Sequence, residues 1–404
     1  MSVVIGIIIG IFMLMFLVTA HEFGHFIAAR RNGVEVEEFG ICFPPRAIAW
    51  RKVGGKWRRL KKSEWSNPPG KGTIISLNLL PIGGFCQMKG ESDADTEKGS
   101  FGAANFWGKT KILFAGVAMN WAVAFVLLTV LAWIGMPHFL DGQFMIENDV
   151  KVIVDEPVKI GEVIKDSPAE KAGLRSGDSV IAMRAIDDGS ESEEIVKTED
   201  LLEFNKKHAG GYVYMNYERD GHEMLAEIKL NDSNADYLLG AGISGSVRYM
   251  SSWSAPIVGL GTTAQITGET FKGVGMLLYN LVSGVVQQIN PNAEVRESGA
   301  KAIKSAGDSV SGPVGIIGVL FPAFAASGLN NLMFLVALIS ISLACMNVLP
   351  IPALDGGRWL LITIYRLRKK KLTKAKEEKI VGRAFMVILI LAAIVTVIDI
   401  IRLF

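Results

Sequence analysis

Two histidines and a glutamate in this 404-residue chain have the spacing of a zinc-hydrolase motif, and they lie inside an apolar run. The motif is His21-Glu22-Phe23-Gly24-His25, within residues 3–29. On a helix, imidazoles four residues apart share one face and can bind one metal ion, while Glu22 can hold the attacking water as general base. Ionisable side chains are costly inside a bilayer, so three together indicate a functional site. The chemistry predicted is zinc-assisted hydrolysis.

A catalytic zinc ion keeps three protein ligands and one open position, so a third ligand is required elsewhere. Asp355 is the best candidate, because it follows two prolines that interrupt an apolar segment. An ordinary Asp-Gly-Gly turn at the end of a span is the alternative. Asn347 and Asn120 lie in apolar segments and could donate to the reacting carbonyl oxygen or orient a substrate. For both, a structural hydrogen bond between helices is the other interpretation.

The composition is typical of a membrane protein with several spans and soluble insertions, since half of the residues are hydrophobic and one fifth are charged. The net charge of +2 is small, and the basic residues gather beside apolar runs, so we expect no nucleic-acid partner. No small-molecule cofactor is expected either. The three cysteines are too scattered for a disulfide framework or a structural zinc site: Cys42, Cys86 and Cys345.

Four membrane spans are predicted from apolar runs of sufficient length. They are residues 1–30, 107–136, 331–365 with a break, and 382–404. The first lacks a basic start and a cleavage site, so we expect a retained span and not a signal peptide. Basic loops after the first and third spans are predicted to be cytoplasmic. The metal motif then lies toward the cytoplasmic side, and residues 137–330 lie on the other side.

A membrane-associated β-region is predicted within the cytoplasmic loop of residues 31–106. Residues 70–91 alternate and break like strands with turns, and they are too short and Gly-rich to span a bilayer. Such a stretch can enter the membrane only where protein covers its backbone. Its edge could accept an extended peptide as an added strand, or the stretch could be an ordinary surface hairpin.

Beyond the second span, residues 150–245 have the pattern of a soluble α+β domain with several strands and two short helices. Residues 250–330 are a predicted extracytoplasmic connecting region. Within it, residues 256–289 have helical character and either pack on the membrane domain or form an extra span or a re-entrant pair. Residues 290–311 are a predicted polar connection. The remaining histidines lack metal-ligand spacing, and we expect surface or structural roles for them: His138, His208 and His222.

Together these motifs resemble the site-2 protease family of intramembrane zinc metalloproteases, and most closely its bacterial branch with a periplasmic PDZ domain. The resemblance rests on His21 to His25 and on Asn347 to Arg358. Further segments are similar to other motifs of the family: Leu79 to Phe85, Lys89 to Glu91, Ala115 to Asn120, and Ser311 to Ile316. The implied fold is a polytopic α-helical membrane protein with about four transmembrane helices, a membrane-associated β-region and one extracytoplasmic α+β PDZ domain.

The resemblance implies that three residues bind Zn²⁺, namely His21, His25 and Asp355, and that Glu22 is the catalytic base. We expect substrate contacts from Asn347, from Asn120 and from the segment Gly83, Gly84 and Phe85. Implied partners are the lipid bilayer of the bacterial inner membrane and single-span membrane proteins that an earlier external cut has shortened. Anti-sigma factors and signal-peptide remnants are examples of such substrates in the family.

The family pattern is not complete in this chain. Several relatives carry two tandem PDZ domains, whereas this sequence has room for one, residues 150–245, which we expect to act as a size filter. Val117-Ala118-Met119 replaces a proline that is common in the family, so the role of Asn120 is left open. The alternative function is a non-catalytic PDZ scaffold with a vestigial metal site. A membrane-anchored protease with an aqueous site would carry the motif in a soluble segment, whereas here it lies in an apolar one.

Overall fold

The computed structural model describes residues 2–140, 142–186, 193–308 and 310–403, so the ends of the first and last predicted spans, Met1 and Phe404, lie outside it. The chain forms two compact units. One consists of Met1–Leu128 with Gly259–Phe404, and the other is the continuous segment Thr129–Val258. The first unit contains every residue of the predicted metal site.

Four helices in the described part of the chain are long and apolar enough to cross a bilayer, as the sequence predicted. They are α1 (Val3–Arg31), α2 (Phe106–Ile134), α9 (Leu329–Val348) and α11 (Lys374–Leu403). Large apolar side chains on their outer faces are exposed, including Phe12 of α1 at 57% and Ile390 of α11 at 56%. Contiguous apolar surface of this kind requires a nonaqueous environment, which the bilayer supplies.

The predicted break in the third span separates α9 from α10 (Asp355–Leu367). Prolines interrupt the helix here because they lack an N–H group. Two glycines then allow the turn to fold tightly. A Cβ atom on Gly356 would lie 2.0 Å from the carbonyl oxygen of Val348, and one on Gly357 would lie 2.0 Å from that of Ile351. Asp355 is therefore the first residue of a helix whose start is fixed by backbone contact.

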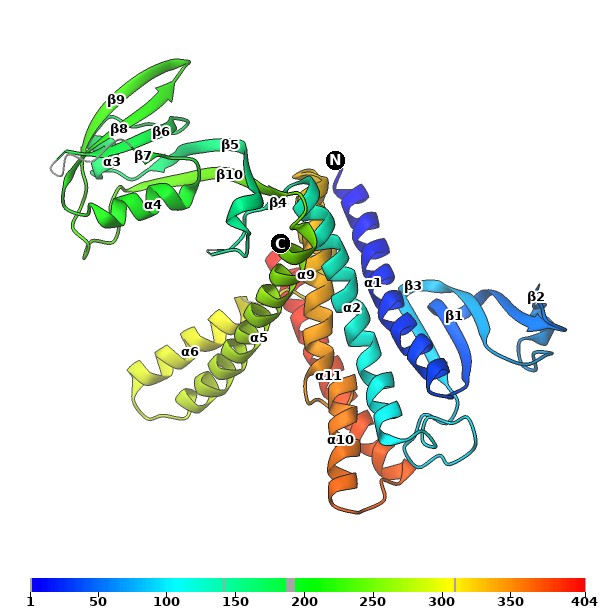
Figure 1. The fold of residues 1–404 in the computed structure, drawn as a ribbon. Helices are drawn as coiled ribbons and strands as arrows, with labels where there is room; N and C mark the ends of the chain where they lie inside the picture. The colour runs from blue at the N-terminus through cyan, green and yellow to red at the C-terminus, as the bar shows by residue number, and fades with distance from the viewer. Residues whose placement is uncertain (1, 141, 187–192, 309, 404) are drawn as a thin grey trace. The chain divides into compact units, whose positions relative to one another are not determined.

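The predicted β-region is a sheet of three described strands in the order β2-β1-β3, next to α1 (Figure 1). Their bounds are Val36–Val53 for β1, Lys56–Arg59 for β2 and Ile74–Met88 for β3. Strand β1 bends at Cys42, whose φ is +65°, and its two halves flank the first half of β3. Ser76 therefore pairs with both Gly40 and Ala49. The second half of β3 pairs with β1 on one side and packs against α1.

The segment Thr129–Val258 is an α+β unit, as expected for residues 150–245. Its described strands follow the order β4-β10-β5-β6-β8-β9, and β7 pairs with β6. Its elements are β4 (Met136–Pro137), β5 (Val150–Val163), α3 (Pro168–Lys171), β6 (Ser179–Ala185), β7 (Glu193–Glu194), α4 (Thr198–Lys207), β8 (Tyr212–Arg219), β9 (His222–Lys229) and β10 (Ala241–Ser251). The sequence pattern does not predict β10, which pairs with most of β5. Gly242, Ser244, Gly245 and Ser246 lie in the first half of β10 and weaken its strand pattern.

The connecting region is more helical than predicted. Helix α5 (Ala255–Gln288) agrees with the predicted helical stretch, and whether it enters the membrane stays a prediction. The predicted polar connection of residues 290–311 is mostly helical, because α6 (Ala293–Asp308) occupies most of it. Small residues let these helices pack, since a Cβ atom on Gly299 would lie 2.8 Å from the carbonyl oxygen of Gly284.

A short apolar segment follows α6 and lies against the first span. It consists of α7 (Pro313–Gly315), a π-helical turn (Ile316–Leu320) and α8 (Phe321–Ala326). Gly6 and Gly10 of α1 make room for α8, because Cβ atoms there would lie 2.5 Å from Pro322 and 2.8 Å from the Phe321 ring. This contact helps to fix α1, the helix that carries the metal motif.

Candidate metal centre

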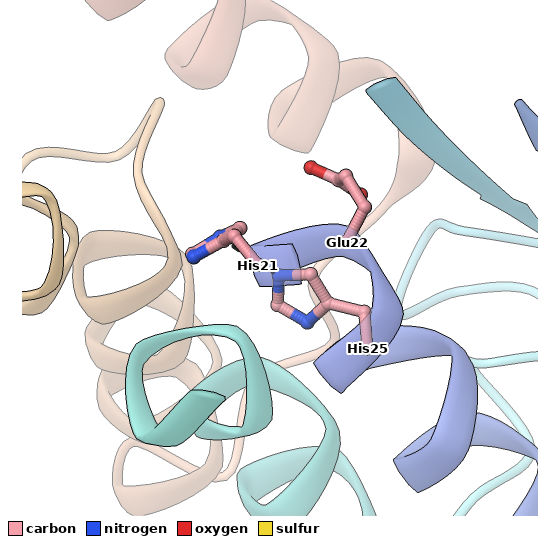
Figure 2. A group of neighbouring side chains, drawn as sticks. All are labelled: His21, Glu22 and His25. Atoms are coloured by element: carbon pink, nitrogen blue, oxygen red, sulfur yellow. Dashed lines mark hydrogen bonds between the residues drawn. The ribbon is translucent and has the colours of Figure 1, made fainter. Parts of the chain in front are cut away.

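His21 and His25 project from consecutive turns of α1 and face the same side of that helix (Figure 2). Both are buried, with 8% and 6% of their surfaces exposed. Their Nε2 atoms lie 3.1 Å apart. The four-residue spacing produces this convergence, because side chains at i and i+4 lie above one another on a helix.

Asp355 completes the group from the other end of the chain. Its Oδ2 atom lies 3.1 Å from Nε2 of His21 and 3.3 Å from Nε2 of His25. Apart from these two imidazoles, this buried oxygen has no hydrogen-bond partner among the described residues. A buried carboxylate oxygen of this kind is costly unless a cation compensates it.

The three convergent atoms fit one zinc ion. Ligand atoms about 2.0–2.1 Å from a tetrahedral ion lie about 3.3 Å from one another, which agrees with the separations found here. Two neutral imidazoles and one carboxylate form a donor set that zinc accepts in catalytic sites, with a fourth position left for water. The three donor atoms converge without displacement of other residues, so the arrangement is preformed.

Helix α2 supports both imidazoles. Nδ1 of His25 donates a 2.8 Å hydrogen bond to the carbonyl oxygen of Ile112. A carbonyl can only accept, so this bond puts the proton of a neutral His25 on Nδ1 and leaves the Nε2 lone pair for a metal. Asn120, two turns further along α2, is almost completely buried, and its amide nitrogen lies 3.4 Å from Nδ1 of His21.

Two glycines allow α1 and α2 to approach this closely. A Cβ atom on Gly24 would lie 2.3 Å from the carbonyl oxygen of Ala115. A Cβ atom on Gly116 would lie 2.6 Å from Nε2 of both His21 and His25, so this glycine leaves the space in which the donors converge. Neither Ile112 nor Gly116 is predicted from the sequence to support the site. Gly116 lies four residues before Asn120 on one helix, and this spacing could have indicated that Gly116 faces the site.

Glu22 lies between the two histidines in the sequence and is partly buried. Its carboxylate belongs to a group in which one ligand atom from each of His21, Glu22 and His25 lies within 4.8 Å of the others. The backbone N–H of Cys86 in β3 faces this carboxylate. The position of Glu22 therefore suits a general base that serves a water molecule beside the donors, close to β3.

The predicted substrate-contacting segment of β3 packs on α1. A Cβ atom on Gly83, whose φ is +84°, would lie 2.7 Å from Val18, and one on Gly84 would lie 3.1 Å from the hydroxyl of Thr19. These contacts bring β3 beside the turn of α1 that precedes His21. The ring of Phe85 packs instead over Gly40 of β1. Contact of these three residues with a substrate stays a prediction.

No described contact places Asn347 beside the donor atoms of His21, His25 and Asp355. Its amide nitrogen donates a 2.9 Å hydrogen bond to the carbonyl oxygen of Leu343, one turn earlier in α9. A role in orienting substrate stays a prediction for Asn347.

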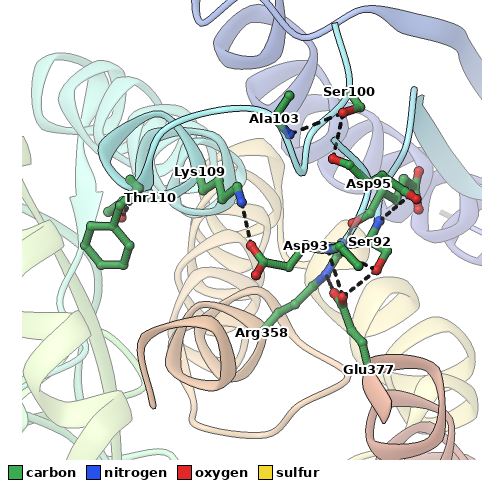
Figure 3. A network of polar contacts seen from close by, with 12 residues as sticks. Ser92, Asp93, Asp95, Ser100, Ala103, Lys109, Thr110, Arg358 and Glu377 are labelled. Atoms are coloured by element: carbon green, nitrogen blue, oxygen red, sulfur yellow. Dashed lines mark hydrogen bonds and ion pairs between the residues drawn. The ribbon is translucent and has the colours of Figure 1, made fainter. Parts of the chain in front are cut away.

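A cluster of polar residues fixes the start of α10, which carries Asp355 (Figure 3). Arg358, one turn after Asp355, donates to the backbone carbonyl of Glu91 and lies 3.5 Å from the carboxylate of Glu377 in α11. Glu377 is 4% exposed and accepts hydrogen bonds of 2.9 Å from the Ser92 hydroxyl and the Asp93 amide. The cluster joins α10 and α11 to the loop after β3.

Comparison with known proteins gives matches along nearly the whole chain. The model of peptidase family M50 matches residues 9–60 and 63–392. A candidate zinc metalloprotease of Clostridium perfringens is 28% identical over 386 residues, which are 95% of each chain. Zinc metalloprotease RasP of Shouchella clausii is 24% identical over 471 aligned residues, covering 96% of this chain and 97% of the relative. The RasP protein of Geobacillus kaustophilus is 25% identical over 478 residues, 96% of each chain.

Proposed function

Because this chain belongs to peptidase family M50, we propose that the convergent donors of α1 and α10 hold its zinc ion. The family and its relatives make the chain a membrane-bound zinc metalloprotease of the site-2 protease type. The proposed ligands are His21, His25 and Asp355. The observation that carries this assignment is the separation of 3.1–3.3 Å among two imidazole nitrogens and one otherwise unpartnered carboxylate oxygen.

Glu22 is the proposed general base. Zinc, when bound, acidifies a water molecule and polarises the carbonyl of the peptide bond that is cut. The Glu22 carboxylate takes a proton from that water and can return it to the departing amine. Its location between the donors and β3 supports this role.

Peptide bonds in single-span membrane proteins are the proposed substrate. A helix engages its own carbonyls in hydrogen bonds, so the substrate must unwind locally before attack. Strand β3 lies beside α1 at the metal motif, and its edge could hold the unwound segment as an added strand. The basic loops support a topology in which the site faces the cytoplasmic side and residues 137–330 lie outside.

The α+β unit is the proposed filter that admits only substrates shortened by an earlier cut, and residues 150–245 are its proposed PDZ domain. Val150 and Ser251 are partners in the sheet, so a short Gly-Ser linker can replace residues 150–251 without stretching the chain. The shortened protein should cleave uncut substrates that the full chain rejects. Unchanged selectivity would contradict the filter.

The assignment of the site is tested with Glu22→Gln and full-length protein purified in detergent. Both this variant and the wild type should bind zinc, and only the wild type should cleave a truncated single-span model substrate. Loss of a general base lowers turnover by about 10²–10⁴-fold. Glu37→Gln is the matched control, since Glu37 is an exposed acid on β1.

Two outcomes would contradict the proposal. Full activity of Glu22→Gln would exclude Glu22 as the base. Zinc binding that survives Asp355→Ala would place the metal elsewhere. If the wild type binds zinc but cleaves no shortened membrane protein of any sequence tested, the alternative of a non-catalytic scaffold gains support.

A further inference from the structure

The surroundings of Asn120 provide a neighbour for the nitrogen of its side-chain amide but none for the oxygen. Asn120 is 1% exposed, and its backbone carbonyl accepts a 2.8 Å hydrogen bond from the hydroxyl of Ser340 in α9. Its amide nitrogen lies 3.4 Å from Nδ1 of His21. Its amide oxygen is buried and has no hydrogen-bond partner among the described residues. A buried acceptor without a donor is costly, so each such group calls for an explanation.

The orientation of this amide decides which nitrogen of His21 can bind a metal. A neutral imidazole carries one proton, on either Nδ1 or Nε2. If the Asn120 nitrogen donates to Nδ1, the proton must be on Nε2, and Nε2 has no lone pair for zinc. That nitrogen is the one which converges with Nε2 of His25 and Oδ2 of Asp355. Donation by Asn120 is therefore incompatible with the metal site.

Exchange of the two ends of the amide removes the conflict. The oxygen and the nitrogen of a carboxamide have nearly the same shape, so their positions follow from the hydrogen bonds they make. With the oxygen toward His21, Nδ1–H donates to it, the buried oxygen gains a donor, and the Nε2 lone pair points to the other ligands. His25 already has the equivalent arrangement, because its Nδ1 donates to the carbonyl oxygen of Ile112.

We propose that Asn120 is a positioning residue whose amide oxygen accepts Nδ1–H of His21 and thereby holds Nε2 toward the zinc ion. One face of α2 then fixes both imidazoles, through the Ile112 carbonyl and the Asn120 amide, and Gly116 between them leaves room for the donors. This replaces the expected role of Asn120 in substrate contact. The inference rests on the proposed zinc ligands.

Three variants of full-length protein test the inference through zinc affinity, measured by competition with a chelator. Asn120→Leu removes the acceptor at similar volume and should weaken zinc binding by about 10–100-fold. Asn120→Asp keeps an acceptor and removes the donor, so its affinity should equal or exceed that of the wild type. Thr129→Val is the matched control on α2, because Thr129 is 7% exposed and its hydroxyl has no described partner.

The aspartate variant distinguishes the proposal from a merely structural role. Affinity as weak in Asn120→Asp as in Asn120→Leu would overturn the inference, because the donor would then be the group that matters. Unchanged affinity in Asn120→Leu would overturn it as well. If Asn120→Leu does not fold, the aspartate variant still decides, because the two orientations predict opposite results for it.

A direct readout uses the zinc-loaded wild type with ¹⁵N-labelled histidine. Nuclear magnetic resonance should find the proton of His21 on Nδ1, and a proton on Nε2 would overturn the inference. Asp355→Ala separates this inference from the proposed site. If Asp355→Ala keeps zinc, both fail. If Asp355→Ala loses zinc while Asn120→Leu keeps full affinity, only the role of Asn120 fails.

Discussion

Gly116 of α2 lies so close to His21 of α1 that a Cβ atom on the glycine would be 2.6 Å from the imidazole Nε2. Real Cβ atoms do not approach other atoms this closely, so any side chain at position 116 must displace the imidazoles or separate the helices. The convergence of the donors thus depends on the absence of a side chain on a neighbouring helix. A residue without a side chain can in this way control whether the site binds metal.

The first prediction concerns Gly116→Ala. Overpacking of this kind costs about 1–3 kcal/mol, and if it acts on the site, zinc affinity should fall about tenfold or more. Chelator competition measures the loss, and cleavage of the model substrate should fall with it. Gly108→Ala is the control on the same helix, because a Cβ atom there would have no neighbour closer than 3.2 Å. Equal zinc affinity in both variants would contradict the packing argument.

The second prediction concerns the polar cluster that holds the start of α10 (Figure 3). Glu377→Ala leaves the Asp93 amide and Arg358 without their buried acceptor, which should destabilise the protein by about 1–3 kcal/mol. Thermal unfolding in detergent measures this change. Glu378→Ala serves as the control, because Glu378 is exposed on the same turn of α11. The same loss of stability in both variants would show that the cluster itself contributes little.

The third prediction concerns Asp399, a buried carboxylate of α11. It accepts backbone hydrogen bonds of 3.2 Å from Gly312 and 2.8 Å from Gly315, at the start of the segment that packs on α1. Asp399→Leu leaves both amides unpaired and should cost about 1–3 kcal/mol, whereas Asp399→Asn should cost less because it keeps an acceptor. Hydrogen exchange of residues 312–326 should increase in the same order. Thr396→Val, one turn away on α11, should change neither property.

The fourth prediction is a pH dependence in the α+β unit. Hydrogen bonds from the hydroxyls of Ser252 and Ser254 lower the pKa of Asp149 from 3.8 to about 2. The folded state therefore binds this proton less readily than the unfolded state does. The resulting stabilisation is complete above about pH 4 and is lost as the pH falls from about 4 to about 2. Asp149→Asn should remove this dependence, and Glu147→Gln, an exposed neighbour, should keep it.

Cleavage of the full-length protein by pepsin between pH 2 and pH 5 measures this loss of stability, since pepsin cuts segments that unfold locally. Cleavage within residues 129–258 should rise in the wild type as the pH falls through this interval. In Asp149→Asn the cleavage rate should already be high at pH 5 and should change less. Parallel curves for the two proteins would mean that Asp149 does not contribute.

Hydropathy and local spacing were enough to predict the membrane helices. The four spans follow from apolar composition over about 20 residues, and a helix places side chains at i and i+4 together whatever surrounds it. His21 and His25 therefore share a face in any helical conformation. The same reasoning failed for α6, where many polar residues suggested a connection, and for β10, where Gly and Ser residues hid a strand that pairing with β5 stabilises.

The sequence by itself determined the chemical character of the site, because the residue types and their helical spacing specify zinc-assisted hydrolysis. Only the tertiary structure brought Asp355 within 3.1 Å of His21, since a contact between opposite ends of a chain depends on how every helix between them packs. The contacts of α2 with the two imidazoles likewise depend on the tertiary structure. The acceptor for His25 is the backbone carbonyl of Ile112, and every residue type carries such a carbonyl, so no side chain in the sequence could identify it.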